Sequence, residues 1–180
     1  MTSPSADVIF VVEEKQCNAD IASKLQLVAT DIDEALSAAR MTGNRFAVVT
    51  FGGSGIHADA QLHTVSGQVF LDSADVSKVE DSMEILDDVS TPSDALAAVQ
   101  MAAELPMRAG AAKSIILITC TGCDSTTTAV GDVTEELLAA GIQLHVVSEQ
   151  DFQLTSLQNQ PRANNLFGEL ELHSHYDVTT

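Results

Sequence analysis

The chain has few aromatic residues and few basic ones. Aromatic residues make up 4% of its 180 residues and tryptophan is absent, so the core must consist mainly of Val, Ile, Leu, Ala and Met side chains. Lysine and arginine number 8 against 26 aspartate and glutamate residues, which gives a net charge of −18. This charge repels phosphate groups, so nucleic acid and anionic membranes are not expected partners. A basic protein surface, divalent cations, or solubility alone are compatible with it.

Long apolar runs are also missing. No stretch of about 18 apolar residues occurs, so the sequence predicts no membrane-spanning helix. Residues 1–7 contain neither a basic nor an apolar segment, and no signal peptide is recognisable. The chain is interpreted as an intracellular protein or as a piece of a longer secreted one. Its three cysteines permit one disulfide and one free thiol, or three free thiols.

What is present is a periodic pattern of apolar residues, which make up 45% of a chain long enough for one domain. Apolar, β-rich runs predict strands at 7–12, 45–51, 114–119 and 142–147, with 114–119 buried on both faces in the middle of a parallel sheet. Alternation over 61–71 predicts an edge strand or a short hairpin. Helical spacing predicts helices at 21–40, 75–86, 91–105 and about 133–141.

The order of these elements predicts an α/β fold. It is a doubly wound, mostly parallel sheet with one antiparallel edge strand and helices on both faces. One domain is expected over residues 1–180, with its core at about 6–150 and a loop-rich segment at 151–180. Gly43 is expected to end the first helix, and Thr91 to cap a helix that Pro92 opens.

Four stretches, 7–12, 45–51, 91–96 and 112–119 with 140–142, together resemble a von Willebrand factor type A domain over nearly the whole chain. This family holds a divalent metal through an Asp-x-Ser-x-Ser pattern after the first strand, a threonine before a helix, and an aspartate after the fourth strand. The resemblance matches Glu13, Lys15 and Cys17 to the first pattern, Thr91 to the threonine and Cys120 to the aspartate. Mg²⁺ or Ca²⁺ would suit oxygen ligands there.

Because Lys15 and the two cysteines depart from the pattern, the metal site is expected to be largely lost, with no cofactor bound. Glu13 and Glu14 are then expected to form a solvated loop pair. The family fold brings the loops bearing Cys17 and Cys120 together. This implies the hypothesis that a disulfide from Cys17 to Cys120 or Cys123 replaces the metal. The alternative is that Cys17 and Cys120 are buried thiols that pack as small apolar groups.

A finer resemblance, carried by residues 52–57, 120–123 and 142–145, is to the A-type domain of large secreted arthropod lipoproteins of the apolipophorin kind. It implies an extracellular module of a lipid carrier, without showing that this domain touches lipid. A cytoplasmic location is the alternative. The expected function is non-catalytic binding of a protein partner at the loops beyond the strand ends.

Two other functions stay open. The first is metal-dependent adhesion that uses Glu13 and Thr91. The second is a thiol oxidoreductase built on Cys120 and Cys123, which follow a predicted strand at the edge where α/β sheets place their ligand sites. Redox enzymes stabilise the first thiolate at a helix N-terminus, whereas residues 125–128 are predicted to form a loop.

Overall fold

A five-stranded sheet organises the protein, whose computed structural model describes residues 4–87, 93–120 and 128–148. The strand order is β3-β2-β1-β4-β5. All neighbouring strands run parallel except β2 and β3, which are antiparallel. The strands are β1 (Ala6–Glu13), β2 (Arg45–Phe51), β3 (Gln61–Leu62), β4 (Ala112–Ile118) and β5 (Gln143–Val147). The predicted α/β class with one antiparallel edge strand is therefore confirmed.

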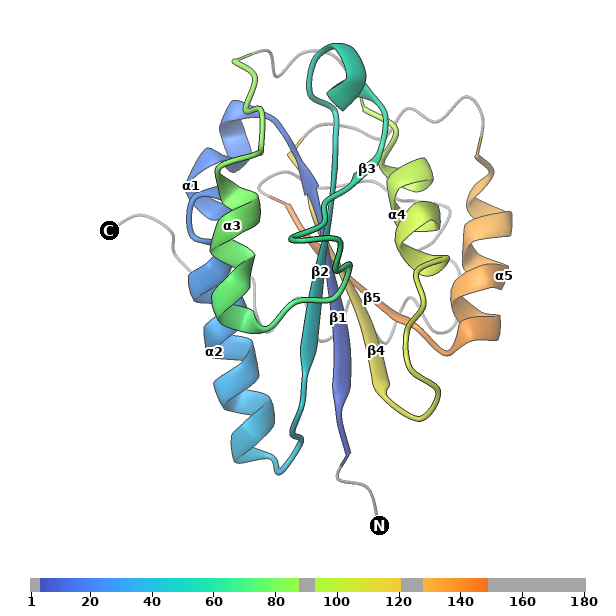
Figure 1. The fold of residues 1–180 in the computed structure, drawn as a ribbon. Helices are drawn as coiled ribbons and strands as arrows, with labels where there is room; N and C mark the ends of the chain where they lie inside the picture. Colours follow the sequence, from blue (N-terminus) through green and yellow to red (C-terminus); the bar gives the residue numbers. More distant parts are fainter. Residues whose placement is uncertain (1–3, 88–92, 121–127, 149–180) are drawn as a thin grey trace.

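Helices cover both faces of this sheet (Figure 1). One face carries α1 (Ala19–Ala22), α2 (Leu25–Ala38) and α3 (Ser77–Glu80), and the other carries α4 (Ala95–Ala103) and α5 (Val130–Ala140). Three short 3-10 helices complete the described part: η1 (Gln16–Asn18), η2 (Gly55–Ala58) and η3 (Ser73–Val76). Among the described residues, no helix is both long and apolar enough to cross a lipid bilayer.

Strand β1 is the buried centre of the molecule. All eight of its residues are buried, and successive side chains alternate between the two faces, as in any strand. Ile9 and Val11 pack toward α4 and α5, while Phe10 packs toward α2 and α3 and stacks on Phe46 at 6.1 Å between ring centroids. Strand β4 has a parallel neighbour on each side, and it contributes Ile115 and Leu117 to one core cluster and Ile118 to the other. The prediction that 114–119 is an inner strand buried on both faces is therefore confirmed, although Ser114 and Ile116 are only partly buried.

Two predicted helices are shorter than their apolar periodicity suggested. The helix expected at 21–40 is divided into α1 and α2 at Ser23 and Lys24, where the Ser23 hydroxyl donates to the Asp20 carbonyl at 3.0 Å. The helix expected at 75–86 ends as α3 at Glu80. Beyond it the chain is extended, because Leu86 N donates to Glu14 O at 3.0 Å. Tertiary pairing thus overrides the helical pattern in the second case.

Helix α4 begins later than the capping pattern predicted. Asp94 is its N-cap, and one of its carboxylate oxygens accepts a hydrogen bond from Ala97 N at 2.9 Å. The prediction that Thr91 caps this helix is therefore wrong. Thr91 and Pro92 themselves lie outside the described residues.

At the amino end of the sheet, a buried carboxylate joins three segments of the chain. Asp7, which is fully buried in β1, accepts hydrogen bonds from Arg45 Nε at 3.0 Å and from Arg108 Nε at 2.9 Å. Arg108 also donates to the Gly43 carbonyl at 2.9 Å. The Arg45 guanidinium lies over the Phe70 ring at 4.3 Å. The start of β1 is thereby fixed to β2 and to the α4–β4 loop, at the end opposite to the expected site.

Candidate functional site

Polar side chains are buried at the edge of the sheet where the parallel strands end. Ligand sites in α/β sheets lie at this edge. Nine polar or charged residues are buried among the described residues, and seven of them lie here: Glu13, Glu14, Lys15, Asn18, Thr50, Ser93 and Thr119. The expectation that Glu13 and Glu14 form a solvated loop pair is wrong, because both are 0% exposed. Both residues continue the path of β1 past its apolar run.

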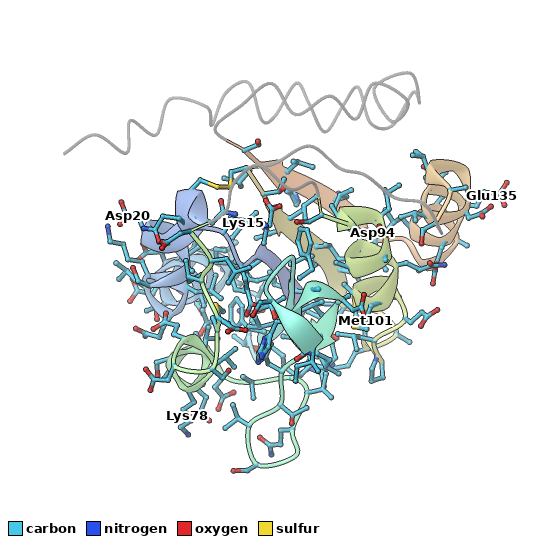
Figure 2. All side chains as sticks on the ribbon, turned by 90° about the horizontal axis from the view of Figure 1, so that it is seen from above. Lys15, Asp20, Lys78, Asp94, Met101 and Glu135 are labelled. Carbon is cyan, nitrogen blue, oxygen red and sulfur yellow. A yellow bond between two sulfur atoms is a disulfide. The ribbon has the colours of Figure 1, made fainter. Side chains whose placement is uncertain are left out.

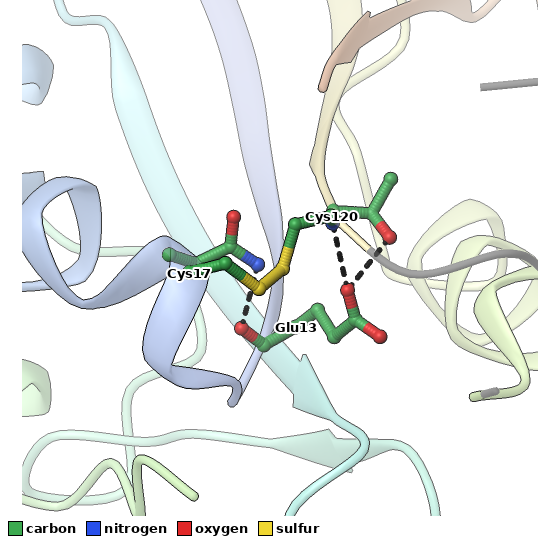
Figure 3. Close-up of a disulfide and its surroundings, with 5 residues drawn as sticks. Glu13, Cys17 and Cys120 are labelled. Atoms are coloured by element: carbon green, nitrogen blue, oxygen red, sulfur yellow. Dashed lines mark hydrogen bonds between the residues drawn. A yellow bond between two sulfur atoms is a disulfide. The ribbon is translucent and has the colours of Figure 1, made fainter. Parts of the chain in front are cut away.

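Glu13 joins the ends of β1 and β4. Its Oε2 accepts hydrogen bonds from the Thr119 hydroxyl and from Cys120 N, each at 2.8 Å (Figure 3). Its carbonyl accepts a hydrogen bond from Asn18 Nδ2 at 3.0 Å, which holds η1 against the strand end. Hydrogen bonds from two donors to a buried carboxylate are of the strong, charge-assisted kind. The Glu13 side chain therefore bonds to the protein's own chain at the position matched to a metal ligand.

A disulfide between Cys17 and Cys120 crosses the same edge (Figure 3). Cys17 lies in η1, and Cys120 follows β4 directly, so the bond joins segments 103 residues apart with a Cα–Cα distance of 6.2 Å. The hypothesis of a disulfide from Cys17 is thus confirmed, with Cys120 as its partner. Cys123 lies outside the described residues.

Three of the positions matched to the metal-binding pattern carry side chains other than oxygen ligands. Cys17 and Cys120, matched to two ligand positions, are bonded to each other. Lys15 is 3% exposed and lies beside the end of β1, as Figure 2 shows from above. In such a low-dielectric place its positive charge would repel a cation. No group of three or more His, Cys, Asp or Glu side chains suited to a metal occurs among the described residues. The proposed role of Thr91 as a metal ligand stays a prediction, because this residue lies outside the described residues.

Glu14, which follows Glu13 in the chain, turns toward a different loop. Its Oε1 accepts a hydrogen bond from Glu84 N at 3.0 Å, and its Oε2 lies 3.3 Å from Nδ1 of His57 in η2. Burial raises the pKa of Glu14, and this outweighs the Glu84 hydrogen bond and the attraction of His57, which lower it. The Glu84 hydrogen bond holds the 84–86 segment at the end of β1. Glu14 Oε2 and His57 Nδ1 face each other in the protein interior, and neither has a hydrogen-bond partner among the described residues.

A hydrogen-bonded chain extends from β2 to the segment after α3. The Thr50 hydroxyl lies 2.8 Å from His63 Nε2, and His63 Nδ1 lies 3.0 Å from the Ser82 hydroxyl. The Ser82 hydroxyl also donates to the Val79 carbonyl at 2.7 Å. The tautomer of His63 sets which of its ring nitrogens donates and which accepts. Burial and the nearby His57 lower the pKa of His63, consistent with a neutral ring.

Sequence reasoning found Glu13, Cys17 and Cys120 but missed their partners. Thr119 and Asn18 gave no motif, although the place of Thr119 at the end of an apolar strand was a usable signal. His57 belongs to the 52–57 stretch of the finer resemblance, which gives it no role of its own. Its meeting with Glu14 joins residues 43 positions apart, which no local pattern reveals.

Comparison with known proteins bears on the fold. No family model and no curated protein sequence matches the chain. Among solved structures, proximal thread matrix protein 1 (PTMP1) from the mussel byssus is 18% identical with a TM-score of 0.59, covering 94% of this chain and 45% of that one. The same mussel protein with a zinc-occupied MIDAS motif is 20% identical, with a TM-score of 0.59 and coverage of 87% and 39%.

The human COPII-coat protein Sec24c is 14% identical, with a TM-score of 0.54 and coverage of 87% of this chain and 28% of that one. This chain thus spans less than half the length of each of these solved chains. At such identities the likeness shows the fold alone. The protein has an α/β fold like that of a von Willebrand factor type A domain.

Proposed function

We propose that this domain is a non-catalytic protein-interaction module that binds its partner without a metal ion. The binding surface is formed by loops beyond the carboxyl ends of β1, β2 and β4. One observation carries the proposal: the edge is closed internally, by the Cys17–Cys120 disulfide and by the Glu13 carboxylate, which accepts hydrogen bonds from Thr119 and Cys120. These bonds hold the strand ends together in the way that a shared ion would.

The disulfide also supports an extracellular location. Disulfides persist in oxidising compartments and are rare in the cytosol. We place the domain in a larger secreted chain, with a lipid carrier as the finer proposal from the arthropod lipoprotein resemblance. The strongly acidic composition, with a net charge of −18, favours a basic partner surface.

Metal-dependent adhesion through Glu13 and Thr91 is the outcome that would contradict the proposal. Isothermal titration calorimetry with Mg²⁺, Mn²⁺ and Ca²⁺ tests it on the oxidised protein. We expect no saturable heat for any of the three ions. Saturable binding that Glu13→Gln abolishes, and that the exposed control Glu104→Gln retains, would establish a metal site and overturn the proposal.

The thiol oxidoreductase alternative is tested by activity. Cys120 is bonded to Cys17 rather than to its near neighbour Cys123, and this supports a structural disulfide. An insulin-reduction assay with dithiothreitol as the electron donor measures disulfide exchange directly. We expect the rate of dithiothreitol alone. A rate increase that Cys123→Ser removes would assign the domain to the redox enzymes.

A further inference from the structure

The η2 turn presents a large apolar side chain to solvent. Ile56 is 75% exposed, more than any other large hydrophobic residue in the described part of the chain. The turn lies between β2 and β3, above the carboxyl edge of the sheet, where it forms the teal coil at the top of Figure 1. Single exposed apolar residues are common on protein surfaces. A binding role for Ile56 therefore requires that the turn be held in a fixed conformation.

The backbone of the turn is closed on itself by hydrogen bonds. Gly53 N donates to the His57 carbonyl at 2.8 Å, and His57 N donates to the Ser54 carbonyl at 2.8 Å. The Gln61 side-chain amide donates to the carbonyl of Ile56 itself. The conformation that exposes Ile56 is therefore held from both sides. A preformed loop loses less conformational entropy when a partner binds.

The base of the turn packs against the end of β1 through Glu14 and His57. His57 Nδ1 lies 3.3 Å from Glu14 Oε2, and the Glu14 side chain is 0% exposed. Gly53 permits this approach. A Cβ at that position would lie 2.6 Å from His57 Cβ and closer still to Glu14 Oε2. The turn that carries Ile56 thus packs directly against the buried Glu14 side chain.

The surroundings of the turn are acidic. Asp59 directly follows η2, and the backbone N of Glu84 donates to the Glu14 side chain. Asp87 comes directly after Leu86, whose N donates to the Glu14 carbonyl. All three acidic side chains are exposed. By contrast, Arg45 and Arg108 lie at the opposite end of the sheet and bind Asp7. An apolar side chain near acidic residues is complementary to an apolar pocket that is bordered by basic residues.

We propose that Ile56 is the anchor residue of the partner interface, and that the partner is a protein with an apolar pocket bordered by lysine or arginine. This rests on the proposed function and deepens it by naming the contact residue and the chemistry of the partner. The interface is preformed, because backbone hydrogen bonds from Gly53 N to the His57 carbonyl and from His57 N to the Ser54 carbonyl close the turn before binding.

A library of random peptides displayed on phage is the probe. Selected peptides are synthesised and titrated against the oxidised wild-type protein, the Ile56→Ser variant and the control Leu27→Ser, which alters an exposed leucine of α2 on a covering helix. We expect selected peptides to combine apolar residues with lysine or arginine. Ile56→Ser should weaken their binding by about tenfold or more, and Leu27→Ser should leave it within about twofold.

A second variant tests the support of the loop. His57→Ala keeps Ile56 but removes the contact with Glu14, and we expect weaker binding with an unchanged far-ultraviolet circular dichroism spectrum. Peptides whose binding survives Ile56→Ser but is lost on other changes at this edge would overturn the inference and leave the proposed function standing. Acidic selected peptides would also overturn the inference. The absence of any selected binder would overturn both.

Discussion

Asp7 is a fully buried carboxylate that two arginines keep ionised. Burial alone would raise its pKa, but hydrogen bonds from Arg45 and Arg108 outweigh this and lower the pKa from 3.8 to about 2. One pKa unit corresponds to about 1.4 kcal/mol, so the depressed pKa stabilises the fold by about 2 kcal/mol above about pH 4. This contribution is lost as the pH falls toward 2, when the native carboxylate takes up its proton.

Asp7→Asn should therefore flatten the pH dependence of stability between about pH 4 and pH 2. It should also lower the free energy of unfolding at neutral pH by about 3 kcal/mol or more, because two guanidinium groups lose their buried counter-charge. Urea unfolding at a series of pH values measures both effects. Asp20→Asn, at an exposed position, is the control for the loss of one negative charge. An unchanged acid slope in Asp7→Asn would contradict the assignment.

Glu13 and Glu14 are neighbours in the chain but contact different parts of the protein. Alternation along β1 sends successive side chains to opposite faces, so Glu13 bonds to Thr119 and Cys120 while Glu14 reaches His57. We expect Glu13→Ala to lower stability by about 3 kcal/mol, since it leaves the buried donors of Thr119 and Cys120 without that acceptor. Thermal unfolding of oxidised protein measures the loss. A change below about 0.5 kcal/mol would mean that water replaces the carboxylate at no cost.

At the scale of elements, the strands were predictable and the helix ends were not. The predicted range 45–51 is β2 as found, and β1, β4 and β5 differ from prediction by a few residues. The stop at Gly141 is an exception and is as predicted. The prediction that Gly43 ends the first helix is wrong, because α2 ends at Ala38. There Arg40 takes the left-handed conformation with a φ of 65° and Met41 N donates to Leu36 O. A helix can end on such a residue at a modest cost when the following chain is fixed in place.

Helix α4 offers a clean test at this scale. Asp94→Ala removes the side-chain acceptor for Ala97 N, so we expect the free energy of unfolding to fall by about 1 kcal/mol. Asp94→Asn and Asp94→Ser keep an acceptor and should recover most of the loss. Chemical denaturation compares the three variants. Equal losses in all three would show that the negative charge, rather than the hydrogen bond, stabilises the helix start.

At the scale of the whole molecule, the disulfide closes most of the described chain into one loop. Its sequence separation is 103 residues, for which the chain-entropy estimate is about 4–5 kcal/mol. That is a large part of the ~5–15 kcal/mol that typical domains possess. Reduction should therefore lower the denaturation midpoint strongly, and Cys17→Ser should reproduce most of that shift.

Cys123→Ser is the matched control for this prediction, since the same reduction should destabilise it as much as the wild type. Intact mass after alkylation, with and without prior reduction, counts the free thiols. We expect one free thiol in the oxidised protein. Three free thiols, or a mass shift that points to a bridge between Cys120 and Cys123, would contradict the Cys17–Cys120 bond.

The family resemblance implied that Glu13, Cys17 and Cys120 meet at one edge, whereas the sequence by itself determined the fold class and the sheet with one antiparallel edge. These follow from period, order and strand ends, which are local properties of the chain. Only the tertiary structure decided which cysteine pairs with Cys17 and that Glu13 bonds to Thr119. It also decided that Glu14 meets His57. The reason is physical: burial and hydrogen bonding between residues 43 to 106 positions apart depend on how the strands are arranged, and no local pattern records that arrangement.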